Sequence, residues 1–456
     1  MLGPVLLLGD DLVRTIRHFW PEFNTWLDQV PDTRFFPFII YDKRFLIWWG
    51  LSLYLFQLGS RRQLDFELDA RGTQILHNLN RLAETTQETR PVHKTLHHFL
   101  GHTGARPIGH LRTHVIQRLI RMRALEAGRL QGYYVIALDS TGHLRFRQPH
   151  CPHCLIQQHE NCTLYLHQVL EAKLLGPADL TLSIATEFIE NSDVNAALAG
   201  EARKQDCELK ALSRLLPAVR RDFPQLRICL AGDSLYACGR TLQLAKDYDC
   251  AYVLTFKEGH MPAVWAEFQS LLPLCPENTL ERTTSAGAHQ VYRWVHDLSY
   301  QDDQGRTWSF HAIQCQETIN GQTTTFAWIT NLRVNARTVV AIATKGGRQR
   351  WHIENQGFNR QKNSGFHLEH VFCTDPELLK AYYYLLQIAH IILQVFEKSS
   401  LLRRLAAACN QTPWQLFGSL KNLARRLLES FRYFALSQDA FDPTRAQRLH
   451  IGFDTS

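Results

Sequence analysis

The 456-residue sequence predicts an α/β fold, in which a mixed sheet is flanked by helices, carries an antiparallel β insertion and has helical N- and C-terminal regions. Three observations predict it. Residues 1–130 have mostly helical apolar spacing, residues 131–275 alternate short apolar runs with helical segments, and residues 276–335 hold alternating runs separated by turn residues. A chain of this length is expected to form two or three structural units, at ~100–200 residues per domain.

The first part of the sheet region, residues 131–275, contains strands and helices in a definite order. Aromatic and branched runs predict strands at 133–138, 164–175, 180–189, 227–231 and 251–256. Helical spacing predicts helices at 201–223, 242–247 and 264–272. Three adjacent strands followed by alternating helices and strands indicate a mixed sheet with helices on both faces, and the RNase H-like fold is one such arrangement.

The β insertion, residues 276–335, is predicted from three alternating runs: HQVYRWVHDLSY, TWSFHAIQCQET and TTTFAWITNL. Helical spacing returns at 336–362 and 378–398, so residues 336–400 are assigned to the last part of the sheet region. The final segment, 401–456, is basic and predicted to be helical.

The charge of the chain suggests an anionic partner. Lysines and arginines number 50 and acids 43, which gives a formal net charge of +7. The bias is uneven: residues 101–130 hold six arginines and one acid, Glu126, and residues 331–365 hold seven basic residues and one acid, Glu354. The alternative interpretation of either run is a solvated helix face.

Nothing in the sequence predicts export or a membrane span. The most apolar stretch, FLIWWGLSLYLFQL at 45–58, has 14 residues, whereas a span needs ~20, so a buried helix is expected. Eleven cysteines without an export signal argue against a disulfide framework. We therefore expect a cytoplasmic protein with no membrane partner.

Two aspartates follow apolar strands. Asp139 follows YYVIAL, and Asp233 follows RICLAG. Two such strands in one sheet can bring the carboxylates together, where each raises the pKa of the other unless a cation lies between them. Hard oxygen ligands of this kind suit Mg²⁺. The alternative for Asp139 is an Asx turn with the following Ser-Thr-Gly.

A third acid, Glu354, lies in the helical stretch RQRWHIENQGFNRQK. Arg350, Glu354, Phe358 and Lys362 are four residues apart, so they are expected on one helix face. Glu354 would complete the metal site, and a second cation there would permit two-metal phosphoryl chemistry. Arg350 and Lys362 would hold DNA phosphates. The alternative is i,i+4 ion pairing, worth about 0.2–0.5 kcal/mol per pair.

This stretch resembles the RWxIE…F…K signature of bacterial insertion-sequence transposases, the DDE enzymes of the hairpin-forming branch with a β insertion. Their motif is Y-x2-R-x3-E-x6-K, and Arg350 and Glu354 match it. Two positions depart. Gly347 stands at the tyrosine position, and Gln361 stands at the lysine position, between Arg360 and Lys362.

Four other segments are similar to the same family, and the resemblance covers roughly residues 130–400. They are VIALDSTG around the first aspartate, LAGDSLYACG around the second, EFIEN at 187–191 and KQDCE at 204–208. The resemblance implies an RNase H-like core in which Asp139, Asp233 and Glu354 are the catalytic residues and bind Mg²⁺ or Mn²⁺.

The resemblance also implies residues that contact DNA. Arg350 and either Lys362 or Arg360 would hold phosphates, and Tyr236 is a further candidate. Trp328, in FAWITN, would stack on a base flipped out of the DNA end, an interaction worth ~1–3 kcal/mol per base. The alternative is that Trp328 is a core residue of the β insertion.

A Cys/His loop, residues 150–167, predicts a zinc site. Cys151, Cys154, His159 and Cys162 have the spacing C-x2-C-x4-H-x2-C, which suits a closed tetrahedral site. The fourth ligand is open, because His150, His153 and His167 are spare donors. The alternative is a histidine-rich surface loop with reduced thiols.

The sequence therefore predicts a transposase that cuts double-stranded DNA at the inverted-repeat ends of a transposon and joins them to target DNA. It would act as a homodimer on DNA in a bacterial cytoplasm, at the nucleoid, with 1–130 as the DNA-binding region. Two alternatives stay open: a domesticated RNase H-like nuclease that does not transpose, and a non-catalytic zinc-containing DNA-binding protein.

Overall fold

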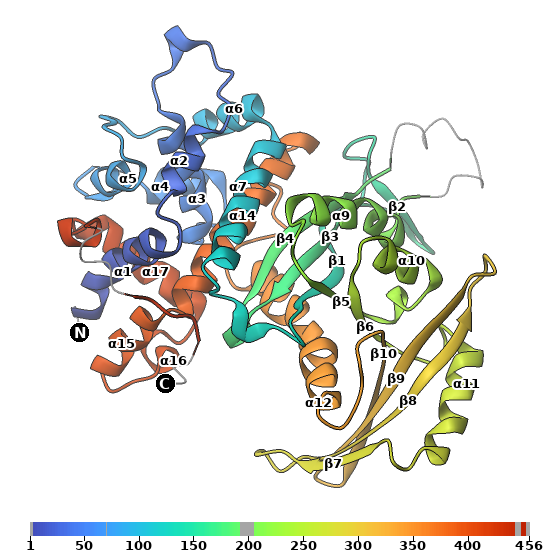
Figure 1. The fold of residues 1–456 in the computed structure, drawn as a ribbon. Helices are drawn as coiled ribbons and strands as arrows, with labels where there is room; N and C mark the ends of the chain where they lie inside the picture. Colours follow the sequence, from blue (N-terminus) through green and yellow to red (C-terminus); the bar gives the residue numbers. More distant parts are fainter. Residues whose placement is uncertain (1–2, 70, 192–204, 443–447, 453–456) are drawn as a thin grey trace. The chain divides into compact units, whose positions relative to one another are not determined.

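The computed structural model describes residues 3–69, 71–191, 205–442 and 448–452 (Figure 1). The chain forms two compact units. We call residues 1–125, 142–166 and 357–456 the helical unit, and residues 126–141 and 167–356 the sheet unit. The expected helix from residue 201 and the segment KQDCE begin within 192–204, so their first residues lie outside the described part.

Helices dominate the helical unit, as the sequence predicts for 1–130 and 401–456. The N-terminal helices are α1 (Gly3–Phe19), α2 (Phe23–Asp28), α3 (Lys43–Leu55), α4 (Arg61–Glu67), α5 (Ile75–Ala83), α6 (His93–Thr103) and α7 (Ala105–Arg121). The C-terminal helices are α14 (Pro376–Glu397), α15 (Ser400–Ala408), α16 (Pro413–Phe417) and α17 (Leu420–Tyr433).

Two apolar helices lie inside the helical unit. Helix α3 is buried along nearly its whole length, which confirms the buried helix expected at 45–58. Among the helices that the structure describes, α14 alone is long and apolar enough to cross a membrane. Its most apolar window is 89% buried, as expected of a core helix, so its length and composition are weak evidence for a span.

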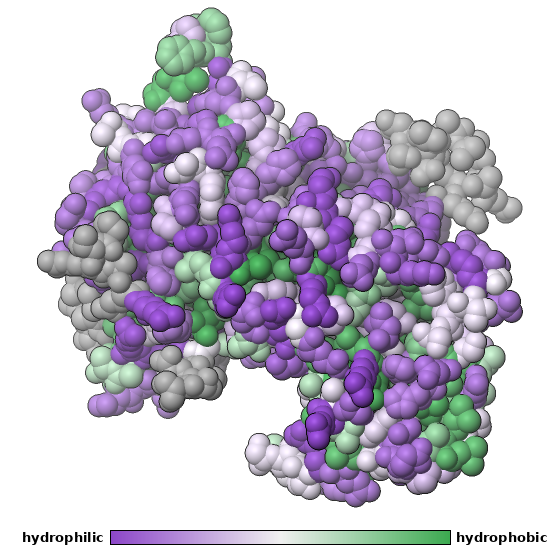
Figure 2. Space-filling model, viewed as in Figure 1, coloured by the Kyte–Doolittle hydropathy of each residue, from purple (hydrophilic) through white to green (hydrophobic). Residues whose placement is uncertain are grey.

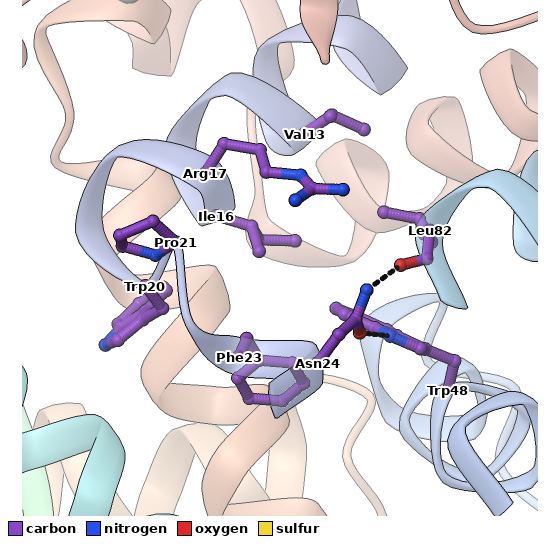
Figure 3. Close-up of a pocket in the computed structure, with 9 residues that line it drawn as sticks. All are labelled: Val13, Ile16, Arg17, Trp20, Pro21, Phe23, Asn24, Trp48 and Leu82. Carbon is purple, nitrogen blue, oxygen red and sulfur yellow. Dashed lines mark hydrogen bonds between the residues drawn. The ribbon is translucent and has the colours of Figure 1, made fainter. Parts of the chain in front are cut away.

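A buried asparagine joins three helical segments beside a pocket of this unit (Figure 3). Asn24 Nδ2 donates to the Leu82 carbonyl at 2.8 Å, and Trp48 Nε1 donates to Asn24 Oδ1 at 2.9 Å. The two bonds satisfy polar atoms that would otherwise be buried without partners, at a cost of ~1–3 kcal/mol each. They fix α2 against α3 and the end of α5.

The loop between α2 and α3 exposes apolar side chains (Figure 2). Phe35, Phe36, Phe38 and Ile40 are 69–85% exposed. A 3₁₀ turn, η1 (Phe36–Phe38), holds the loop tip, which is the apolar projection at the top of Figure 2. Exposed apolar clusters of this kind are unusual on a protein surface.

The mixed sheet expected from the sequence is confirmed. In the part of the chain that the structure describes, it has ten strands, in the order β2-β3-β1-β5-β6-β10-β9-β8-β7, and β4 also pairs with β3. The strands of the first part are β1 (Tyr134–Phe146), β2 (Leu155–His159), β3 (Cys162–Leu175), β4 (Thr181–Ile189), β5 (Ile228–Gly232) and β6 (Ala251–Thr255). Its helices are α9 (Glu208–Asp222), α10 (Gly239–Asp247) and α11 (Pro262–Leu271).

The antiparallel strands predicted at 276–335 are present and extend the same sheet. The strands of this region are β7 (Thr279–Thr283), β8 (His289–Gln301), β9 (Thr307–Ile319) and β10 (Gln322–Thr330). Strand β10 pairs antiparallel with β6, with Trp328 opposite Thr255. The insertion therefore covers what would be the free edge of β6. Strands β2 and β7 are additional to the predicted ones.

The helix expected at 336–362 is correct in extent but not in regularity. It is built from α12 (Val339–Ala341), a π segment (Ile342–Gly347), a 3₁₀ segment (Arg348–Trp351), a second π segment (Ile353–Asn359) and α13 (Arg360–Asn363). The winding changes the faces: Glu354 is exposed, whereas Phe358 is 4% exposed. These two residues therefore do not share the single face that α-helical spacing predicts.

Candidate active site

The sheet brings the first two predicted carboxylates to equivalent positions. β1 pairs in parallel with β5, and the last pair is Ala137 opposite Ala231. Asp139 and Asp233 each lie two residues beyond that pair. Because parallel strands run in the same direction, both acids come to the same edge of the sheet.

The position of Asp139 differs in one respect from the expectation. It does not end its strand, because β1 continues to Phe146 while its pairing with β5 stops. Asp139 Oδ1 accepts a hydrogen bond from the Ser140 backbone N–H at 2.9 Å. Asp233 accepts similarly from the Leu235 N–H at 2.9 Å. Each aspartate thus keeps an oxygen for another partner.

The site concentrates negative charge. Burial raises the pKa of Asp139 to about 6, and the nearby carboxylates of Glu208 and Asp233 raise it too. Arg350 opposes this shift, and its Nη1 lies 3.7 Å from Asp139 Oδ2. The side chains of Asp139 and Arg350 are 23% and 16% exposed, so water screens the charges only in part. A divalent cation would offset the cost of burying this charge and the repulsion from the two neighbouring carboxylates.

Glu208 is a site residue that the sequence analysis did not select. It is the first residue of α9, and both of its oxygens are used. The Ser140 hydroxyl donates to Oε1 at 2.6 Å, and the Tyr236 hydroxyl donates to Oε2 at 3.0 Å. Its one sequence signal is its place in KQDCE, a segment similar to the transposases.

Tyr236, a predicted DNA contact, is fully buried. A Cβ on Gly232 would come within 2.9 Å of the Tyr236 Cβ, so the ring is packed against the strand that leads to Asp233. Burial, with the adjacent Glu208 carboxylate, raises the pKa of Tyr236. The phenol therefore stays protonated and donates its hydrogen bond within the protein.

Glu354, the third predicted acid, lies one turn beyond Arg350 and is exposed. Within the described residues, a single group of three or more His, Cys, Asp or Glu ligand atoms lies within 4.8 Å of one another, and it is a His/Cys cluster. Asp139, Asp233 and Glu354 are therefore not gathered that closely. Arg350 contacts Asp139 and stands four residues before Glu354 in the same irregular helix.

The two basic residues next to the lysine position of the motif form ion pairs with acidic residues of the helical unit. Lys362 Nζ lies 2.9 Å from Glu369, and Arg360 Nη1 lies 2.7 Å from Glu397. Gln361, at the motif position itself, is fully buried and donates to Gln387 Oε1 at 2.8 Å. A lysine there would bury an ammonium group, which accounts for the departure from the motif.

Trp328 and Gly347 account for the second departure. Trp328 is 3% exposed, and a Cβ on Gly347 would lie 2.4 Å from its Cε2 atom. The indole therefore occupies the space in which a side chain at position 347 would begin, and a tyrosine cannot fit there. In this packing Trp328 is a core residue of the β insertion.

The exposed tryptophan of this region is Trp351, which is 59% exposed. It directly follows Arg350 and precedes Glu354 by three residues. An indole that stands in solvent beside the candidate site is available for stacking, whereas Trp328 is not. Trp351 was not a candidate in the sequence analysis, because sequence spacing does not separate buried from exposed tryptophans in an irregular helix.

The Cys/His loop forms a cluster that could hold a metal ion. Its members are His150, Cys151, Cys154 and His167, whose ligand atoms lie within 4.8 Å of one another. The sulfur atoms of Cys151 and Cys154 are 3.8 Å apart. Two thiolates and two imidazoles are compatible with tetrahedral zinc.

The cluster corrects two members of the predicted ligand set. His159 and Cys162 lie opposite each other at the turn of the β2–β3 hairpin, whereas Leu155 lies opposite Leu166 at its other end. Continuing that register places His167 opposite Cys154. The turn is five residues from Cys154, or about 16 Å at ~3.3 Å per residue. His159 and Cys162 are therefore too far along the hairpin to join Cys154.

Comparison with known proteins assigns no family to this chain. A scan against protein-family models finds no match, and a search of curated proteins finds none.

Proposed function

We propose that this chain is a DDE transposase, which cuts DNA at transposon ends in a metal-dependent reaction and joins the ends to target DNA. The observation that carries the proposal is the parallel register of β1 and β5, with Asp139 and Asp233 each two residues beyond the last pair. Arg350, beside Asp139, supports the assignment of the following helix, with Glu354, to the same site.

The donor set fits Mg²⁺ or Mn²⁺. Asp139, Asp233 and Glu354 offer carboxylate oxygens, the ligands that Mg²⁺ takes together with water and phosphate oxygens. The pKa of Asp139 is raised first by burial and then by the nearby Glu208 and Asp233 carboxylates, so a bound cation would stabilise its charged form. When bound, the metal would supply activation of a water or 3′-hydroxyl and stabilisation of the leaving oxygen.

The protein's own residues would bind and orient the DNA. Arg350 would hold a phosphate next to Asp139, with its planar donor fork suited to two phosphate oxygens. Trp351 would stack on a base near the cut, since its ring is exposed. Lys362 and Arg360 would reach phosphates only by exchanging their present acid partners.

The strand order also supports an RNase H-like core. β1, β5 and β6 are parallel neighbours, and β3 and β4 continue the sheet beyond β1 in antiparallel pairing with each other. The fold by itself would not imply the reaction, because one fold hosts many functions. We place the protein in a bacterial cytoplasm, acting as a homodimer on two transposon ends.

We further propose that zinc fills the His/Cys cluster and has a structural role. Four protein ligands leave no open position for a substrate, which is the pattern of structural zinc sites. The ion would fasten the β2–β3 hairpin, whose far end carries the exposed Cys162.

The testing experiment compares wild type with Asp233→Asn on a labelled duplex that carries the inverted repeat flanking the coding sequence. The variant is expected to bind the duplex as wild type does and to make no cut with Mg²⁺ or Mn²⁺. Cleavage without joining to target DNA would favour a nuclease that does not transpose. Equal cleavage by both proteins would contradict the assignment of Asp233, and binding without cleavage by wild type would favour a zinc-containing DNA-binding protein.

A further inference from the structure

We infer that Glu208 is a positioning residue that holds the two aspartate-bearing segments together, one with each oxygen of its carboxylate. The inference rests on the proposed metal site. Oε1 accepts from the hydroxyl of Ser140, the residue after Asp139, at 2.6 Å. Oε2 accepts from the hydroxyl of Tyr236, three residues after Asp233, at 3.0 Å.

The two bonds join segments that are far apart in the sequence. Ser140 lies on β1, beyond its pairing with β5, and Tyr236 lies in the turn that follows β5. Backbone pairing between these strands has ended before either aspartate. Glu208 thus connects the two segments beyond the last β1–β5 pair, where backbone pairing no longer fixes the separation of Asp139 and Asp233.

The carboxylate itself is firmly placed. Glu208 begins α9, which is anchored by buried Leu212, Leu215 and Val219. A negative charge in the first turn of a helix is stabilised by the helix dipole. Hydrogen bonds to a charged acceptor are also shorter and stronger than those between neutral groups.

The Tyr236 side of the connection has little freedom to move. Its ring is fully buried and lies against Gly232, the residue before Asp233. The hydrogen bond from Tyr236 to Glu208 therefore also restrains the backbone at Asp233. With Glu208 in place, Asp139 and Asp233 would be held ready for a divalent cation, whereas without it part of the binding energy would be lost in ordering them.

Binding of Mn²⁺ by the full-length protein, followed by electron paramagnetic resonance without DNA, tests this role. The comparison is between wild type and Glu208→Gln, with Asp139→Asn defining binding elsewhere. Glu208→Gln is expected to weaken Mn²⁺ binding by about tenfold or more, the effect of removing a residue that orients metal ligands. Asp222→Asn removes an acid at the other end of α9, where Asp222 pairs with Arg221 at 2.9 Å, and should bind as wild type.

Two further variants keep the test valid if Glu208→Gln does not fold. Ser140→Ala and Tyr236→Phe each remove one bond, and each should weaken Mn²⁺ binding by a smaller factor. In a Glu208→Ala background neither substitution should have a further effect, because both acceptor oxygens are gone.

Three results would overturn the inference. Wild-type affinity in all of these variants would show that Glu208 does not position the acids. A complete loss in Glu208→Gln, equal to that in Asp139→Asn, would make Glu208 a ligand. If wild type binds no Mn²⁺, the proposed metal site does not exist. If Mn²⁺ binds as predicted but the protein cuts no DNA, the proposed function fails while the positioning role stands.

Discussion

Arg350 Nη1 lies 3.7 Å from Asp139 Oδ2. The pKa of this aspartate is raised to about 6 by burial and by two neighbouring acids. The pair links β1, which carries Asp139, to the irregular helix that carries Glu354. Arg350 therefore balances part of the negative charge around Asp139, and under the proposed function it would also bind a phosphate.

Replacing Arg350 should slow DNA end cleavage. Arg350→Ala is expected to lower the single-turnover rate with Mg²⁺ by about 100-fold, the scale for one electrostatic contact to the transition state. The cleavage rate of Arg350→Lys should lie between those of wild type and Arg350→Ala, because lysine keeps the charge but not the planar fork. Arg348→Ala is the matched control, since Arg348 pairs with Glu317 at 2.7 Å within the sheet unit. An equal defect in that control would contradict a specific role for Arg350.

Zinc binding should depend on the four residues of the observed His/Cys cluster and not on the ligand set predicted from sequence spacing. Protein purified without added metal is expected to hold about one zinc per chain, measured by mass spectrometry of the metal, as a closed four-ligand site would. Cys154→Ser and His167→Ala should lose it, because each removes a ligand of the cluster.

The control variants for zinc are His159→Ala and Cys162→Ser, which change the hairpin turn. They should keep the full zinc content. Loss of zinc in these variants together with retention in His167→Ala would restore the ligand set that the spacing predicts.

Substitutions of Trp351 and Trp328 should have different effects, the first on DNA binding and the second on the stability of the protein. Trp351→Ala is expected to weaken binding of the DNA end by about 1–3 kcal/mol, because an exposed indole can stack on a base. Its thermal unfolding should not change. Trp328→Ala is expected to destabilise the protein by about 3–5 kcal/mol, as for other buried aromatic residues.

Fluorescence anisotropy with the end duplex and thermal denaturation would measure both effects. If Trp328→Ala weakens DNA binding without loss of stability, the base-stacking role belongs to Trp328 after all.

Gly347→Ala should destabilise the sheet unit. The new methyl group would lie 2.4 Å from the Trp328 ring, and overpacking of this kind costs about 1–3 kcal/mol. Gly101→Ala is the matched helical control, since nothing lies within 4 Å of its Cβ position. Alanine there should be neutral or stabilising, because it favours helix more than glycine. Urea denaturation of both variants tests this, and an unchanged midpoint for Gly347→Ala would exclude the proposed clash.

Much of the fold could be predicted because local signals agree with the final packing. The apolar runs that end near Asp139 and Asp233 became β1 and β5, and the alternating runs became β8, β9 and β10. The short edge strands β2 and β7 carry weaker patterns, since their residues are largely exposed and have no apolar face to reveal.

The site could be predicted only in part, because several of its features depend on register. The pairing of β2 with β3 selects His167 over His159, and spacing along the sequence does not contain that information. Glu208 joins the two aspartate-bearing segments only because α9 begins beside both. The π and 3₁₀ winding likewise exposes Trp351 and buries Phe358, which a regular helix would not predict.

Metal-dependent DNA cleavage by this site is measured by incubating a labelled duplex that carries the inverted repeat, with Mg²⁺ or Mn²⁺, with wild type and with Asp139→Asn side by side. Wild type is expected to make a metal-dependent cut at the end of the repeat and the variant none, although both bind the duplex equally. Tight binding by wild type with no cut in either metal would contradict the proposed function, and equal cutting by Asp139→Asn would show that the chemistry lies elsewhere.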